Sequence, residues 1–443
     1  MQVHPKLCML LTLFQSKKAL TWRWILTLSI FFTLTFSVAA QEAVISSYFN
    51  AASPNDEWTE ILVISDNLNM GGWYLHDNNS AQQDWQDSIV FNSIPFWNNM
   101  RAGTIIIIWH RSTSGTGSPH TLEVNKTDGY IELDASNATY FHGGVFTGNN
   151  NTMNIAASGD IYELKKPNYQ HVHSLSHKTT VDSCYNNMPV PKLNYKGSLS
   201  TGDAVYVFPG SNLADYGTPA QNGTTYTAKG TDITFGLPNN SSSSVNSNFW
   251  RLTRQPVWTS PVLSATPNAA FTQVSLSWNT CADPYFSDGT VGYIILRNAT
   301  NSFTDPADGT SYSTGATIGT ATVVSNIAST GSPNYTYTDN ITITCGNTIY
   351  YRIYAYRYSG DNLNISNPAR GRAYNETFAA APAIGPTATV TPVSITVDRN
   401  NFCADDPGDI VLTAIGGSGT SIEWFDDVCG GNLIGTVNSL TIP

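Results

Sequence analysis

The sequence has few charged residues for its length. They make up 12% of the 443 positions, about half the share in an average soluble domain. Thr, Ser, Asn and Gly fill their place, and these residues suit exposed strands and turns. The charge that is present is mostly acidic, with a formal net charge of -11. Such a chain would repel phosphate backbones, so we expect no nucleic-acid partner.

Motifs of the common enzyme classes are also lacking. The chain has no Gly-x-Ser-x-Gly, no His-Glu-x-x-His and no paired glycosidase signature. Its one glycine-containing candidate for a phosphate loop, residues 114–117, lacks the required Lys. Heptads and sustained helical periods are missing too. We therefore expect neither an enzyme nor a helical protein, and no cofactor.

The longest apolar run is short. Residues 25–38 form a run of 14 residues, whereas a membrane-spanning helix needs roughly 20. Basic residues precede the run, and small residues end at Ala40, which is the pattern of a cleaved signal peptide. We predict a signal peptide at 1–40 and a secreted or cell-surface protein with no membrane span after cleavage. A single membrane anchor is the alternative.

Short runs rich in Val, Ile, Trp and Tyr, bounded by Asn, Asp, Gly or Ser, dominate the rest of the chain. Four such runs lie within residues 44–110. A Gly/Asp turn followed by an alternating run then recurs at 128–133, 159–164 and 202–208. This pattern predicts an all-β protein of tandem β-sandwich modules, with the first module at 41–255.

The first module resembles the lamin-tail domain. The similarity is carried by EWTEI at 57–61, MGGWYL at 70–75 and AGT at 102–104, and it covers about residues 43–178. Residues 82–100 look like an insertion relative to that family. The resemblance implies an immunoglobulin-like sandwich and brings no catalytic residue with it.

Residues 256–378 resemble a fibronectin type III domain. The resemblance places Trp278 on the second strand, GYIILR (292–297) on the third and CGNTIYYRIYA (345–355) on the sixth. Ile349 stands where the family has its tyrosine-corner residue. The corner hydrogen bond is then absent, or Tyr350 or Tyr351 makes it. Alternation predicts that Tyr351 points inward, and that Tyr350, Tyr354 and Tyr356 point outward.

The sequence predicts a linker and an incomplete third module in the C-terminal part. Residues 379–392 are rich in Ala and Pro, which predicts a semi-extended spacer. Residues 393–443 resemble the immunoglobulin-like repeats of large bacterial surface proteins. Such a sandwich needs about seven strands, but only three or four precede Pro443. We therefore expect the chain to be the N-terminal part of a longer one.

The sequence holds six cysteines. Cys403 and Cys429 flank neighbouring predicted strands of the third module, so we predict a disulfide between them. Cys281 and Cys345 fall at opposite ends of the fibronectin-like sandwich, too far apart for a bond unless the loop 282–290 folds back. Cys184 has no evident partner, and Cys8 leaves with the leader.

Two patterns are candidate metal sites. His171, His173 and His177 alternate on one predicted strand, so their imidazoles share a face and could bind Zn²⁺ or Cu²⁺. Polar residues facing solvent are the favoured interpretation. Asp and Asn cluster at 66–69 and 77–79 and could offer oxygens to Ca²⁺. Turn chemistry alone explains both clusters.

Aromatic residues crowd the first module. A platform for stacking sugars is one interpretation, and packing in a β-sheet core is the favoured one. The residues concerned are Trp73, Tyr74, Trp85, Trp97 and Trp109.

Together these patterns predict a non-catalytic, modular, exported surface protein whose sandwiches act as spacers and adhesive surfaces. The order of resemblances is typical of large surface proteins of gliding-type Gram-negative bacteria. Partners would be extracellular proteins or glycans. Two alternatives stay open: the accessory region of a secreted hydrolase whose catalytic domain lies beyond Pro443, and a carbohydrate-binding module in residues 41–255.

Overall fold

The computed structural model describes residues 41–110, 122–143, 153–207, 213–230, 253–344, 346–359, 371–385, 394–399, 408–416, 422–426 and 432–442. Strands dominate these residues, so the predicted all-β class is confirmed. The predicted signal peptide and the predicted Cys403–Cys429 bond lie outside them, as does Cys345. In the part of the chain that is described, no helix has the length and apolar character needed to cross a bilayer.

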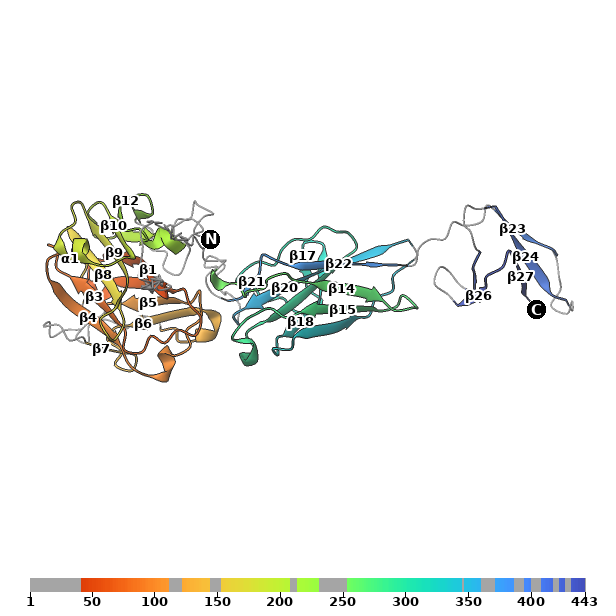
Figure 1. Ribbon diagram of the computed structural model, residues 1–443, viewed down its shortest axis with the longest axis horizontal. Helices are drawn as coiled ribbons and strands as arrows, with labels where there is room; N and C mark the ends of the chain where they lie inside the picture. Colours follow the sequence, from red (N-terminus) through yellow and green to blue (C-terminus); the bar gives the residue numbers. More distant parts are fainter. Residues whose placement is uncertain are drawn as a thin grey trace, which may run out of the picture. The chain divides into compact units, whose positions relative to one another are not determined.

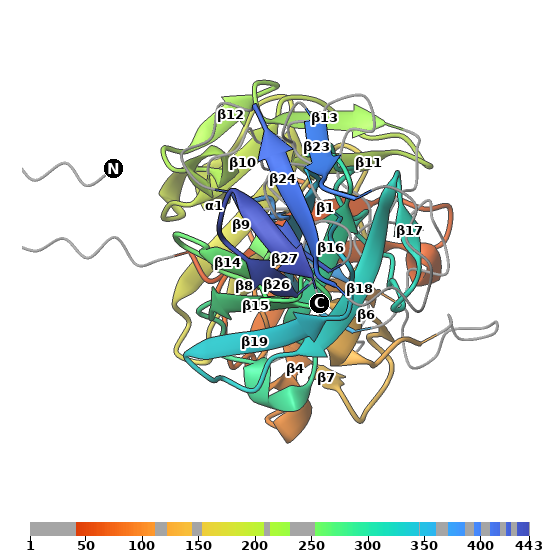
Figure 2. The same ribbon diagram turned by 90° about the vertical axis from the view of Figure 1, so that its right-hand side faces the viewer.

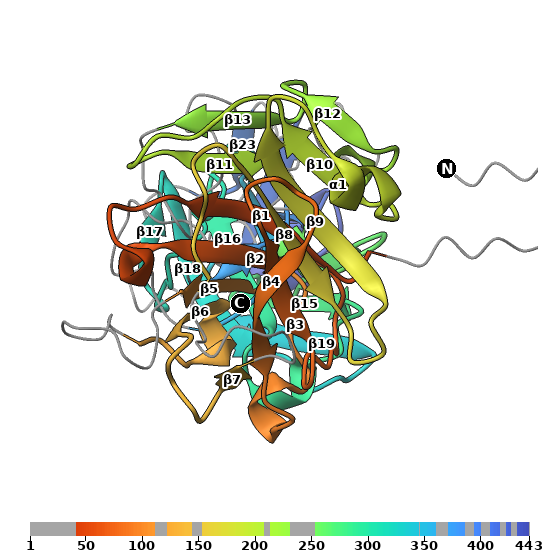
Figure 3. The same ribbon diagram turned by 90° about the vertical axis from the view of Figure 1, so that its left-hand side faces the viewer.

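The first module is a sandwich of two sheets, one of six strands and one of seven (Figure 1). The six-stranded sheet runs in the order β13 (Thr227–Gly230), β11 (Ala204–Val207), β1 (Ala43–Phe49), β2 (Trp58–Val63), β5 (Ile105–Trp109), β6 (Tyr130–Asp134). The seven-stranded sheet runs in the order β12 (Gln221–Gly223), β10 (Lys192–Tyr195), β9 (His171–Lys178), β8 (Gly159–Lys165), β3 (Tyr74–Asn78), β4 (Trp85–Phe91), β7 (Phe141–Gly143). Figure 3 shows β3, β4, β8 and β9 crossing β1, β2 and β5 as a second layer.

The core of this module is built from strands that are buried on both faces. The four isoleucines of β5 are all fully buried, as expected for a continuous apolar run rather than an alternating one. β4 lies inside the segment predicted to be an insertion, yet it pairs with β3 and β7. That segment is therefore an integral strand of the sheet.

Short helices connect the strands of the two larger modules. They are η1 (Pro54–Asp56), η2 (Pro95–Trp97), η3 (Lys126–Asp128), α1 (Ser183–Asn187), η4 (Leu213–Tyr216) and η5 (Phe286–Asp288).

The second module is also a sandwich of two sheets (Figure 1). The first sheet has the order β14 (Leu263–Pro267), β15 (Val274–Asn279), β19 (Asn334–Asp339). The second has the order β17 (Thr317–Ile318), β18 (Ala321–Ala328), β16 (Gly292–Asn298), β20 (Thr348–Arg357), β21 (Ala373–Tyr374), and β22 (Ala379–Ile384) also pairs with β20. If the two-residue strands β17 and β21 are set aside, Trp278 lies on the second strand, 292–297 on the third and 348–355 on the sixth, as the resemblance implies.

Two predictions for this module are wrong. Residues 379–384 are the strand β22 and not the start of a linker, because they pair with β20 from Thr348 to Ile353. Tyr354 and Tyr356 do not face solvent, because they pack with Tyr374, Ile318 and Val323 in a second small core on that face of the sheet. Tyr351 is fully buried, and its hydroxyl donates to Asp339 at 2.8 Å.

The third module has five strands among its described residues, more than the three or four that its sequence predicts. β23 (Ser394–Val397), β24 (Ile410–Ile415) and β27 (Ser439–Ile442) form one sheet, and β25 (Trp424–Phe425) pairs with β26 (Leu433–Gly435), drawn in blue in Figure 2. Of its described residues, Trp424 and Leu440 are the buried hydrophobic ones.

Candidate functional site

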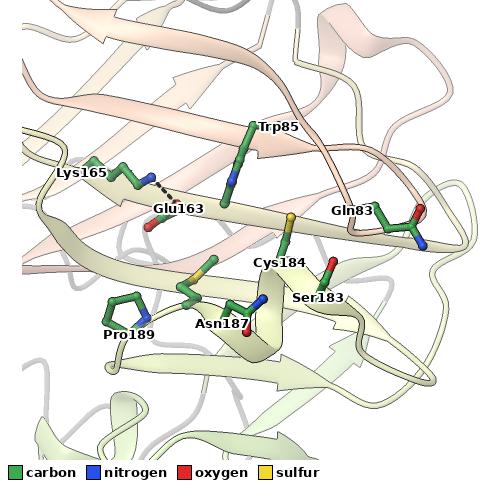
Figure 4. A pocket seen from close by; sticks show the side chains of 9 residues that line it. Gln83, Trp85, Glu163, Lys165, Ser183, Cys184, Asn187 and Pro189 are labelled. Atoms are coloured by element: carbon green, nitrogen blue, oxygen red, sulfur yellow. Dashed lines mark ion pairs between the residues drawn. The ribbon is translucent and has the colours of Figure 1, made fainter.

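A pocket of about 350 Å³ opens on the outer face of the seven-stranded sheet of the first module. Alternation along β8 creates this face: Tyr162 and Leu164 enter the main core, so Ile161, Glu163 and Lys165 point the other way. α1 packs over Ile161 through Tyr185 and Met188. Figure 4 shows the side chains that line the pocket, which are Gln83, Trp85, Glu163, Lys165, Ser183, Cys184, Asn187, Met188 and Pro189.

The short helix α1 is held in place at both ends. The Asp182 carboxylate accepts a hydrogen bond from the Ser183 amide at 2.7 Å at its start, as an N-cap does. The Lys192 ammonium donates to the carbonyls of Tyr185 and Met188 at its end, each at 2.7 Å. These bonds satisfy backbone groups that a helix end leaves unpaired, and they fix one wall of the pocket.

The charged groups in the pocket compensate one another. Glu163 pairs with Lys165 at 3.0 Å and with Nδ1 of His171 at 2.7 Å. The Lys165 ammonium also lies 5.0 Å from the centre of the Trp85 ring, within the range of a cation–π contact. The pocket therefore presents an aromatic ring beside a neutralised ion pair.

Cys184 is not set up as a nucleophile. Burial, together with the nearby Asp84 carboxylate, raises the pKa of its thiol above the usual value. A thiol that stays protonated is a poor nucleophile, because the thiolate is the reactive form. Neither Cys184 nor Cys281 is part of a disulfide bond, and Cys281 is buried.

The three histidines of the predicted metal site are fully engaged in protein hydrogen bonds. Nδ1 of His173 accepts from the Ile45 amide at 3.0 Å, and its Nε2 lies 3.0 Å from the Tyr216 carbonyl. His177 contacts the Tyr48 hydroxyl and the Ala156 carbonyl, and His171 contacts Glu163 and the Pro191 carbonyl.

For His173 and His177, the favoured interpretation, side chains facing solvent, is wrong. His173 and His177 are fully buried, because β9 turns them toward β1 of the opposite sheet. The described residues contain no cluster of three or more His, Cys, Asp or Glu that could hold a metal ion.

The Asp/Asn clusters proposed for Ca²⁺ also have other partners. Asp66 forms a two-point ion pair with Arg357. Asp77 is buried and accepts from the Asp87 amide at 2.9 Å. Asn69 and Asn79 accept hydrogen bonds from the amides of Gly71 and Gln83, which is the turn chemistry expected of Asn.

The aromatic residues considered as a sugar platform are mostly core, as the favoured interpretation predicts. Trp73, Trp97 and Trp109 are buried in the main core, and Tyr74 is buried against His76. Trp85 alone of these five is partly exposed, and it lines the pocket.

Three buried arginines connect the first module to the second. Arg357, at the end of β20, pairs through Nε with Asp283 of its own module at 2.7 Å and through both terminal nitrogens with Asp66 of the first module at 3.0 Å. Arg101 reaches from the first module to Asp288 and, at 2.5 Å, to Thr290. We call this set of contacts, with those of Arg254, the junction.

Arg254 is the third member of the junction and pairs with backbone carbonyls. It donates to Gly103 at 2.8 Å in the first module and to Gly371 at 3.0 Å in the second. Its guanidinium also stacks 4.3 Å from the centre of the Tyr358 ring. Gly103 has φ +83, and a Cβ there would lie 2.4 Å from the Arg254 side chain, so this approach requires glycine.

Sequence reasoning missed most of the pocket and all of the junction arginines. The alternation of Ile161, Glu163 and Lys165 was a usable signal for the pocket face. Nothing in the spacing could have paired Arg357 with Asp66, which lies 291 positions away.

No family model matches the chain, and no curated protein matches it. Among solved structures, the FN1–FN3 domains of chicken CNTN1 show 8% sequence identity over 90% of this chain and 85% of theirs, with a TM-score of 0.19. A likeness at this level does not indicate function. The sheets described above define the class: the chain is a protein of tandem β-sandwich modules.

Proposed function

We propose that the chain is a non-catalytic, exported surface protein in which the first two modules form one stiff spacer that carries adhesive surfaces. The resemblances to lamin-tail, fibronectin and bacterial immunoglobulin-like repeats support this role. The junction is the observation that carries the spacer part of it.

The energetics of the junction explain why it would stiffen the chain. Arg357 is almost fully buried, with 1% of its side chain exposed, and Asp283 is fully buried. Removing one partner of such a pair leaves an uncompensated charge and costs roughly 3–5 kcal/mol. A hinge motion that separated Arg357 from Asp66 would break a two-point ion pair. The penalty is smaller than for truncation, because Arg357 keeps Asp283 and Asp66 is 26% exposed, but it still opposes bending between the two modules.

Calorimetry of the full chain tests the spacer. We expect the first two modules to unfold together in one transition, and Arg357→Ala to split that transition into two. Arg297→Ala is the matched control, because the Arg297–Asp339 pair lies within the second module. The control should lower the midpoint and leave a single transition. Two independent transitions in the unmodified chain would contradict the proposal.

A further inference from the structure

The pocket beside Trp85 has the features of a site for an uncharged, hydroxyl-rich ligand. We propose that it binds one neutral sugar residue of a glycan. This inference goes beyond the spacer role and does not depend on it, because the pocket lies on the outer face of the first module and uses none of the junction residues.

The first step is the aromatic ring. Figure 4 shows Lys165 on one side of Trp85, and Cys184, Ser183 and Gln83 on the other. The Lys165 ammonium occupies a position 5.0 Å from the ring centre. A T-shaped contact with the His76 ring, with the ring centres 5.5 Å apart, also restrains the Trp85 ring. On the side of Cys184, Trp85 packs in part against the cluster of Ile161, Tyr185 and Met188. The part of the ring that lines the pocket is a pre-positioned flat apolar surface, which suits the C–H face of a sugar ring.

The second step is the hydrogen-bonding rim. Gln83, Ser183 and Asn187 are exposed at the mouth of the pocket. Amide and hydroxyl side chains both donate and accept hydrogen bonds, and so do the hydroxyls of a sugar. Sites for small ligands usually combine an aromatic or apolar surface with a few polar groups around it.

The third step is charge. Lys165 is neutralised by Glu163 at 3.0 Å, and the other oxygen of Glu163 contacts His171 at 2.7 Å. An anionic ligand that drew Lys165 away from Glu163 would leave that carboxylate, whose side chain is 2% exposed, with the contact to His171 but without its ammonium partner, which is costly. This favours neutral sugars over sialylated, sulfated or phosphorylated ones.

The fourth step is size. A volume of about 350 Å³ lies at the lower end of the range for ligand pockets, roughly 300–1,000 Å³. It fits a single residue at the end of a glycan or along it, and not a long buried segment.

The test is binding of the full chain to a panel of immobilised neutral and sialylated oligosaccharides, followed by calorimetric titration with the best neutral binder. We expect neutral members to bind, and Trp85→Ala to weaken that binding at least about tenfold. Trp85→Phe keeps a smaller ring and should weaken it less. Tyr169→Ala is the matched control, because Tyr169 is an exposed aromatic of the same module outside the pocket lining.

Three outcomes would overturn the proposal: no neutral oligosaccharide bound, sialylated members alone bound, or unchanged affinity in Trp85→Ala. Circular dichroism checks that each variant is folded. If Trp85→Ala does not fold, Gln83→Ala combined with Asn187→Ala replaces it, because both side chains are exposed and leave the core intact. Unchanged affinity in that double variant would also overturn the proposal.

Discussion

At the scale of single residues, the interior of the first module holds more ionisable side chains than β-sheet cores usually do. Burial lowers the pKa of His173 to about 3 and that of His177 to about 4, so both imidazoles are neutral in the folded protein. Burial raises the pKa of Asp77 and Asp160, and the Asp77 carboxylate adds to the rise at Asp160. The two histidines and the two aspartates must therefore contribute to the pH dependence of folding.

The histidines and the aspartates change the free energy of unfolding in opposite directions as the pH falls. A histidine whose pKa is lowered on folding contributes stability above pH 6.5, and this is lost as pH falls toward 4, because the unfolded chain binds protons that the folded one does not. The aspartates, with raised pKa values, contribute stability at low pH that is lost as pH rises. A comparison of variants can separate the two contributions.

We predict that His173→Gln lowers the free energy of unfolding at pH 7.5, because the contacts with Ile45 and Tyr216 are disturbed. The same variant should lose less stability than the unmodified chain between pH 7.5 and 4.5, because one buried titrating group is gone. Urea unfolding at several pH values measures both effects. His142→Gln replaces an exposed imidazole and serves as the control. An unchanged pH slope in His173→Gln would contradict the prediction.

At the scale of elements, alternation located strands well where one face is buried and the other is not. It found β15, where Val274, Leu276 and Trp278 are buried and the two residues between them are exposed. It failed at β22, because Ala and Pro are weak strand formers. β22 tolerates Pro382 because it pairs with β20 alone, and Pro occurs on edge strands.

The strand assignment of β22 can be tested by a charge scan. We predict that Ala383→Asp destabilises the second module by roughly 3–5 kcal/mol, because it buries an unpaired carboxylate in the core. Ala383 is fully buried there. Ala380→Asp should change stability little, because Ala380 is exposed on the same strand. Thermal unfolding of the two variants checks this, and equal midpoints would restore the linker interpretation.

At the scale of the whole molecule, the tandem β-sandwich class could be predicted from sequence, and the connection between the first two modules could not. Short apolar runs and turn residues in the sequence mark the strands of each module. The junction joins Asp66, Arg101, Arg254 and Arg357, whose partners lie up to 291 positions apart, so no local pattern encodes it. The pocket is similar: β4, β8 and α1 supply its walls, and only the folded sheet brings Trp85 next to Lys165.

We propose that residues 1–40 are a cleaved signal peptide, and the first strand indicates where the cut would fall. Glu42 already belongs to the fold: its carbonyl accepts from the Ile64 amide at 2.8 Å, and its carboxylate pairs with Lys166. A cut beyond Glu42 would remove these contacts, whereas a cut after Ala40 keeps them. We therefore predict that the exported protein begins at Gln41 and that Ala40→Trp blocks processing, since peptidase sites require small residues. Mass spectrometry of the N-terminal peptide decides this: a retained leader in the unmodified protein would favour the membrane anchor instead.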